Sequence, residues 1–232
     1  MRKFSALVVL ALVLGAVMAA GCITGTETET GTATGTQGPP EDRGYGQGVA
    51  APAEGMIDIS NVSAGELSQD EIDAILYMRE EEKLARDVYL TLYNATGLRI
   101  FENIARSEET HMDMVLQLIE RYNLTDPAEG KAIGEFSNPE IQALYDELVS
   151  RGEKNDVEAL KVGALIEEVD IKDLKEWLSR TDNEDIRLVF ESLMAGSENH
   201  LRAFTRILGN SYGVEYIPQV LSEDEYRSII GS

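Results

Sequence analysis

Only two histidines occur in the 232-residue chain, His111 and His200, and each lies on the apolar stripe of a segment with helical periodicity. Glu82, Glu108 and Glu167 lie on the apolar stripes of three such segments. A carboxylate on a buried stripe is costly unless it is paired, hydrogen-bonded or bound to a metal. Three facing carboxylates would repel one another strongly, so bound divalent cations are the simplest remedy and protonation is the alternative.

The spacing of Glu108 and His111 strengthens the metal interpretation. Residues three positions apart on a helix share one face, so this carboxylate and this imidazole can reach the same metal pair. Di-iron carboxylate bundles use a Glu from each of two helices and a Glu-x-x-His pair from each of the other two. His200 departs from that pattern, because Ser197 stands three positions before it. Glu198 is no substitute, since it points about 200° away from His200 on a helix.

We therefore predict a metal site with five of the six protein ligands of that pattern: Glu82, Glu108, His111, Glu167 and His200. Asp170, one turn beyond Glu167, or a water molecule would supply the sixth ligand. The loss of a bridging carboxylate at Ser197 would mean a weaker site, a single metal or a degenerate site.

The elements that must position these residues are helices. Periodicity and capping signals predict long helices over about 68–94, 98–122, 155–179 and 183–209, and shorter ones over 137–152 and from Ser222. The third long helix has apolar residues on both sides, so the side that faces the core is less well defined than in the other three long helices. Two helices, a long connection with a small helix, and two more helices is the arrangement of an all-α four-helix bundle with one crossover, which ferritin-like proteins have, so we expect a bundle of that type. Glutamates off the inward stripes are expected on a solvated surface: Glu80, Glu81, Glu109, Glu168, Glu191 and Glu198.

Two segments resemble the rubrerythrin branch of the ferritin-like superfamily. Residues 82–89, EKLARDVY, resemble the E-x-x-A-R-x-x-Y pattern of its first helix, and residues 104–111, IARSEETH, resemble its I-A-x-x-E-x-x-H pattern. A stronger resemblance is to domain of unknown function 2202, an uncharacterised ferritin-like family of exported archaeal and bacterial proteins. It rests on segments 78–93, 162–174, 196–204 and 216–219 and extends over about 67–230. It implies the bundle fold and no particular reaction.

The candidate ligands, together with the rubrerythrin-type segments, lead us to expect a di-iron or manganese centre, whose leading chemistry would be redox with peroxide or oxygen. Such an enzyme would need a separate electron-donor protein, because the chain has no rubredoxin-type cysteines. The alternatives are a non-enzymatic metal-sequestering protein and an interaction module with a degenerate site. Around the centre we expect Arg86 as a carboxylate partner, Tyr89 mainly as a core aromatic, and Ser197. Homodimerisation is expected only by analogy with other ferritin-like proteins.

The N-terminus predicts export and attachment to a membrane. A positive start is followed by an apolar run over residues 4–20 that ends at Gly21-Cys22 and resembles a lipobox. Residues 1–21 would be the signal peptide, and Cys22, the only cysteine, would carry the lipid. An uncleaved anchor would give the same location, on the outer face of the cell membrane.

The remainder of the chain divides at about residue 66. Residues 22–66 are rich in Thr, Gly and Pro and predict a disordered tether, and residues 67–232 form the predicted bundle domain. The net charge of −22 makes nucleic acid and anionic lipid headgroups poor partners. Part of that charge would instead be gathered inside the bundle to hold cations.

Overall fold

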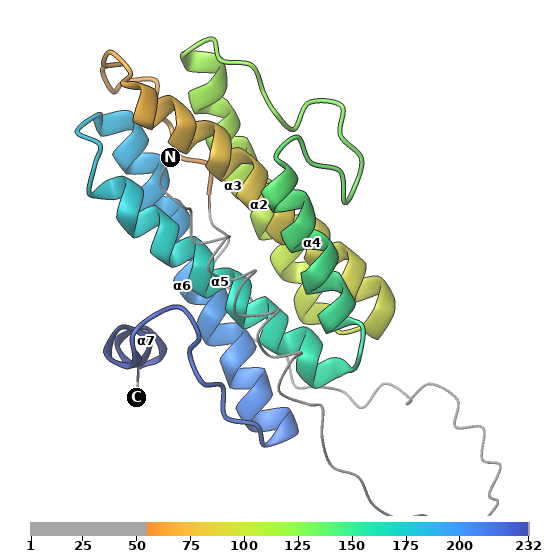
Figure 1. Cartoon of the computed structure of the whole chain (residues 1–232). Coiled ribbons are helices and arrows are strands. Elements are labelled where there is room, and N and C mark those ends of the chain that lie inside the picture. Colours follow the sequence, from red (N-terminus) through yellow and green to blue (C-terminus); the bar gives the residue numbers. More distant parts are fainter. Residues whose placement is uncertain (1–54, 232) are drawn as a thin grey trace, which may run out of the picture.

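The computed structural model describes residues 55–231, which form six α-helices and no strands (Figure 1). The all-helical prediction is therefore confirmed for this part of the chain. The predicted signal peptide 1–21 and Cys22 lie outside the described residues. No helix within 55–231 has both the length and the apolar composition needed to cross a membrane. The helices are α2 (Gln69–Thr96), α3 (Arg99–Arg121), α4 (Pro139–Gly152), α5 (Asp156–Leu178), α6 (Glu184–Tyr212) and α7 (Glu223–Ile230).

The four long helices form two antiparallel hairpins, α2 with α3 and α5 with α6 (Figure 1). Helix α2 also packs on α5, and α3 packs on α6, so the four helices enclose one shared hydrophobic core. The first hairpin reverses at Gly97, whose φ of 71° is a left-handed conformation that glycine adopts without a Cβ clash. Helix α2 begins with the capping box of Ser68 and Glu71, as the sequence predicts.

A long connection, residues 122–155, carries the chain from the end of α3 to the start of α5. Helices α3 and α5 run in the same direction, so this connection must travel back along the helices (Figure 1). Helix α4 lies within it and packs against both α2 and α5. Asn138 caps α4 by accepting a hydrogen bond from the backbone N–H of Glu140, and Pro139 is its first residue. The predicted connection with its own short helix is therefore present.

Helix α5 is buried on two sides, which is why periodicity did not show which side faces the core. Leu160 and Ile171 are buried in the hydrophobic core. Leu165 and Val169 line a small cavity together with Leu144 of α4, so α4 covers the second side of the helix. A helix covered by neighbours on two sides needs apolar residues on both of them.

Three glutamates that we expected on the surface are buried: Glu80, Glu81 and Glu168. This prediction was wrong, and for two of them the reason is that the connecting segments use their carboxylates as anchors. The carboxylate of Glu80 accepts hydrogen bonds from the backbone N–H groups of Ser137 and Asn138, where α4 begins. Such anchors cannot be predicted from helix periodicity, because their partners lie in segments without periodicity.

Glu168 of α5 anchors the segment that leads to α7. Its fully buried carboxylate accepts backbone N–H groups of Gln219, Val220 and Leu221 over 2.8 to 3.1 Å, and the hydroxyl of Tyr216 over 2.5 Å. Hydrogen bonds to a charged group are stronger than those between neutral groups. One carboxylate thus holds the C-terminal segment against the bundle.

The N-terminal segment contacts the helices through Ile57, which is partly buried against the core, and through Ile59, both inside the stretch 22–66 for which we expected a tether. Ile59 is buried, and Arg121 of α3 donates hydrogen bonds to the backbone carbonyls of Ile59 and Val62. The last residues of that stretch are therefore attached to the bundle.

Replacing the carboxylate of Glu168 should weaken the fold. We expect Glu168→Gln to lower the free energy of unfolding by about 2 kcal/mol, because the amide places N–H donors against backbone N–H donors. Urea denaturation measures the effect. The matched control is Glu191→Gln on the exposed side of α6, which should change the value by less than about 0.5 kcal/mol. Equal stability of the two variants would contradict the anchoring role of Glu168.

Candidate metal centre

All five predicted ligands lie in the middle of the shared core, and none is more than 2% exposed. Helices α2, α5 and α6 each supply one residue and α3 supplies two: Glu82 from α2, Glu108 and His111 from α3, Glu167 from α5 and His200 from α6. They form two groups of three residues whose potential ligand atoms lie within 4.8 Å of one another. Either group could hold a metal ion.

The first group joins α2 and α3. Nδ1 of His111 lies 3.2 Å from Oε2 of Glu82 and 2.8 Å from Oε2 of Glu108. Glu82 and His111 are almost equally far from Gly97 along the chain, so the tight reversal of the hairpin brings them to the same level. The Glu-x-x-His spacing then adds Glu108 from the same face of α3.

The second group joins α3, α5 and α6. Nδ1 of His200 lies 2.9 Å from Oε1 of Glu108 and 3.5 Å from Oε2 of Glu167. Glu108 therefore belongs to both groups and turns one oxygen toward each histidine, and the two imidazole rings stack with centroids 5.6 Å apart. A carboxylate in this position can bridge two cations.

Several buried atoms of the centre have no hydrogen-bond partner: Oε1 of Glu82, Oε1 of Glu108, and Nδ1 and Nε2 of His200. Oε1 of Glu108 and Nδ1 of His200 approach closely but not in hydrogen-bond geometry. Buried polar atoms normally find partners, and those that do not need an explanation. Carboxylate oxygens and imidazole nitrogens are suitable ligands for iron, manganese and zinc, so the residues present fit a metal pair.

Burial and charge together perturb every pKa that is resolved in the centre. Burial raises the pKa of Glu82 and of Glu167 to about 7, although the neighbouring histidines oppose the shift. Burial also acts to raise the pKa of Glu108, but His200 and His111 outweigh it and hold that pKa below its usual value. For His200, burial is outweighed by Glu108 and Glu167, which raise its pKa to about 10. A metal must therefore displace protons from the metal-free centre at neutral pH.

Tyr89 holds one side of the centre in place. Its hydroxyl donates a 2.5 Å hydrogen bond to Oε1 of Glu167, which leaves Oε2 facing His200. The Tyr89 ring packs against the rings of Phe101 and Phe204, with centroids 5.9 and 5.4 Å away. Burial, followed by the nearby carboxylates, raises the pKa of Tyr89 well above its usual value, so the phenol stays protonated as a donor.

Ser197 and Asp170 contact each other beside the centre. The Ser197 hydroxyl donates to Oδ2 of Asp170, while Oδ1 of Asp170 is buried without a hydrogen-bond partner. Burial, and then the charge of Glu82, raise the pKa of Asp170 well above its usual value. Asp170 belongs to neither group of three, so it lies next to the five residues and not among them.

Arg86 lies outside the five-residue centre. Its guanidinium pairs with Asp87 at 2.8 Å and with Glu109 at 3.4 Å. It is a carboxylate partner, as expected, but its charge offsets those two residues and not the candidate ligands.

Two acidic residues near the centre were missed by the sequence analysis. Glu81 and Asp173 are each 3% exposed, and Glu81 lies close enough to Asp173, Asp170 and Glu82 for all three charges to act on it. Two features of the sequence could have indicated them. Glu81 lies in a run of three glutamates that includes Glu82, and Asp173 lies three residues after Asp170.

The metal-free protein should lose stability as pH rises. The pKa values of Glu82, Glu167 and His200 all lie above their ordinary values, so the folded state keeps protons that the unfolded chain releases. Glu82 and Glu167 contribute to this loss of stability between their ordinary pKa of 4.5 and about 7. His200 contributes between its ordinary pKa of 6.5 and about 10. Urea denaturation of the chelator-treated protein at several pH values measures this fall.

The histidine contribution can be isolated. His200→Gln should remove the part of the pH dependence above neutrality, and NMR of the two imidazoles should find one that titrates near pH 10. An imidazole of His200 that titrates near 6.5 in the folded, metal-free protein would contradict the proposed pairing with Glu108.

Comparison with known proteins identifies the family to which this chain belongs. Residues 71–232 match the family model described as "Uncharacterized protein domain (DUF2202)". The "Uncharacterized protein MJ0754" of Methanocaldococcus jannaschii is 56% identical over 174 residues, which cover 75% of this chain and 94% of that protein. The crystal structure of hypothetical protein MJ0754 from Methanococcus jannaschii DSM 2661 matches with a TM-score of 0.72 at 56% identity, covering 74% of this chain and 97% of the other. The family model spans all but the first two residues of the described helices, and this chain therefore belongs to the DUF2202 family.

Proposed function

We propose that the protein binds a pair of iron or manganese ions between its four long helices. The main support for the proposal is the position of the Glu108 carboxylate between the two histidines. Its Oε2 lies 2.8 Å from Nδ1 of His111, and its Oε1 lies 2.9 Å from Nδ1 of His200. Glu82 completes one position and Glu167 the other. Asp170 would supply the sixth protein ligand, from α5 in place of the carboxylate that Ser197 replaces on α6.

We further propose that the bundle is ferritin-like and of the rubrerythrin type. Support comes from the two antiparallel hairpins, the crossover that joins parallel helices α3 and α5, and the inward Glu-x-x-His pair on α3. In that architecture metal ligands project from facing helices into the bundle core. The five candidate ligands here are arranged in this way.

When bound, such an ion pair would supply redox chemistry with peroxide or oxygen, each ion giving up one electron, so that the pair provides the two electrons that reduction of peroxide requires. The chain would bind and orient the ions through Glu108 and the two histidines, while Tyr89 fixes the rotamer of Glu167 by its hydrogen bond. The packed core excludes water around them. Electrons would come from a separate donor protein, because Cys22 is the only cysteine of the chain.

A second function, metal sequestration without turnover, is favoured by two observations. The chain has no cysteine pair that could hold a second redox centre, and all five candidate ligands are almost fully buried. A buried centre without its own electron relay suits storage of an ion as well as it suits catalysis. In either case we propose that lipid on Cys22 holds the domain on the outer face of the cell membrane.

Metal stoichiometry tests both functions. We expect the full chain, loaded anaerobically with Fe(II), to bind about two ions per chain. Glu108→Gln should reduce this number, because it removes the shared carboxylate, and His111→Ala and His200→Ala should each empty one position. The measurement is bound iron per chain after gel filtration.

The control for this experiment is Glu109→Gln, which changes the exposed neighbour of Glu108 and should leave two ions bound. Consumption of peroxide or oxygen by the loaded protein supports the redox function, and binding without consumption supports sequestration. No bound iron in the unaltered chain would refute the metal-binding proposal and leave an interaction module.

Asp170 and Ser197 should contribute to affinity. Partners that orient metal ligands typically contribute 10- to 100-fold to metal binding, so we expect Asp170→Asn to weaken Fe(II) binding by at least about tenfold. Ser197→Ala should act in the same direction by a smaller factor, because it only releases the Asp170 carboxylate. Competition with a coloured chelator measures the affinity. The exposed Asp113→Asn is the control, and an Asp170→Asn variant with unchanged affinity would exclude Asp170 from the centre.

A further inference from the structure

A second group of buried carboxylates lies next to the candidate centre, between α2 and α5. We call Glu81, Asp170 and Asp173 the α2–α5 acid cluster. Each is at most 5% exposed, and the two helices that carry them pack against each other. None of the three belongs to the groups whose ligand atoms lie within 4.8 Å of one another.

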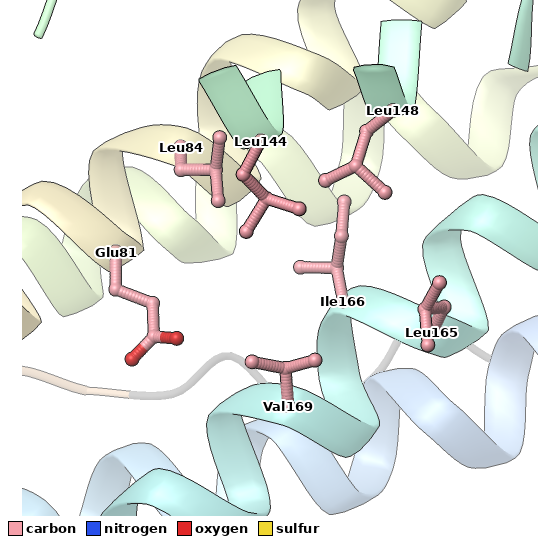
Figure 2. A pocket seen from close by; sticks show the side chains of 7 residues that line it. All are labelled: Glu81, Leu84, Leu144, Leu148, Leu165, Ile166 and Val169. Carbon is pink, nitrogen blue, oxygen red and sulfur yellow. The ribbon is translucent and has the colours of Figure 1, made fainter. Parts of the chain in front are cut away.

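Glu81 is the unusual member of the cluster. Both of its carboxylate oxygens are buried without a hydrogen-bond partner. Figure 2 shows this carboxylate in the space between α2 and α5, at one end of a cavity of about 10 Å³. The other lining residues are all apolar: Leu84, Leu144, Leu148, Leu165, Ile166 and Val169. A carboxylate here is costly unless a proton or a cation neutralises it.

The cluster continues to the candidate ligands without interruption. Glu81 lies within electrostatic range of Asp173, Asp170 and Glu82. Asp170 in turn lies within range of Glu82 and Glu167. On α5 the residues Glu167, Asp170 and Asp173 follow one another at three-residue spacing, so each step moves about one helical turn away from the centre. The carboxylates thus form a row that ends at the candidate metal ligands.

We propose that Glu81 and Asp173 of the α2–α5 acid cluster bind divalent cations transiently and pass them, by way of Asp170 as the proposed sixth ligand, to the centre. This inference rests on the proposed metal-binding function. Carboxylate oxygens bind divalent cations such as Fe(II) and Mn(II), and a low-dielectric wall of leucines strengthens their attraction for a cation. The looser spacing of the oxygens, compared with the two groups at the centre, suits a site that releases its ion.

The test measures the rate at which metal binds to the protein separately from the final amount of bound metal. Co(II) is mixed with the metal-free full chain in a stopped-flow instrument, and the visible absorption of the bound ion is followed to completion. We expect Glu81→Gln and Asp173→Asn each to slow loading by about tenfold, because each replaces a carboxyl group, which can release its proton and bind a cation, with an amide that cannot. The final amount of bound Co(II) should be unchanged. Glu81→Asp, which keeps a carboxyl group, should load faster than Glu81→Gln.

Glu176→Gln is the matched control, since it removes a charge from the exposed side of α5 three residues after Asp173. It should load at the rate of the unaltered chain. The inference is overturned if Glu81→Gln and Asp173→Asn load at the unaltered rate, or no more slowly than Glu176→Gln. It is also overturned if Glu81→Gln lowers the final amount, because Glu81 would then be a permanent ligand. Absence of bound Co(II) in the unaltered chain would instead refute the proposed function itself.

Discussion

The structure depends on how acidic side chains in the middle of a helical core are neutralised. Glu82, Glu108 and Glu167 point at one another from three helices, and their mutual repulsion in a low-dielectric interior would oppose the packing of the bundle. In the metal-free state the histidines and retained protons relieve this repulsion: His200 is held in its charged form by Glu108, and Glu82 and Glu167 titrate near neutrality. The same acids that oppose the packing of the core could hold a metal ion.

The two hairpins determine where these acidic side chains and the histidines lie relative to one another. Because Glu82 and His111 are nearly equidistant from the turn at Gly97, closing the first hairpin places them side by side. In the second hairpin Glu167 and His200 also lie side by side, with Oε2 and Nδ1 3.5 Å apart, although they are not equally far from the turn. Glu108 then lies between the two halves. Packing of α3 on α6 is therefore both a folding step and the step that assembles the centre.

Sequence analysis predicted the helices and the inward position of the five central residues, because both depend on short-range rules. Capping residues mark helix ends, and a Glu or His within an apolar stripe is visible as a break in composition. It did not predict the burial of Glu80 and Glu168, whose partners are backbone N–H groups of the crossover and the C-terminal segment. Nor could it find the contact between Ser197 and Asp170, since these residues meet only after α5 and α6 have packed.

The aromatic contacts of Tyr89 have a consequence for the symmetry of the bundle. On one side of Glu167 lie three packed rings, Tyr89, Phe101 and Phe204, and on the other side lie Asp170 and Asp173. The centre is therefore bounded by packed aromatic rings on one side and by buried carboxyl groups on the other. A cation and a small apolar molecule would meet different side chains at these two ends, even though the two hairpins pair almost symmetrically.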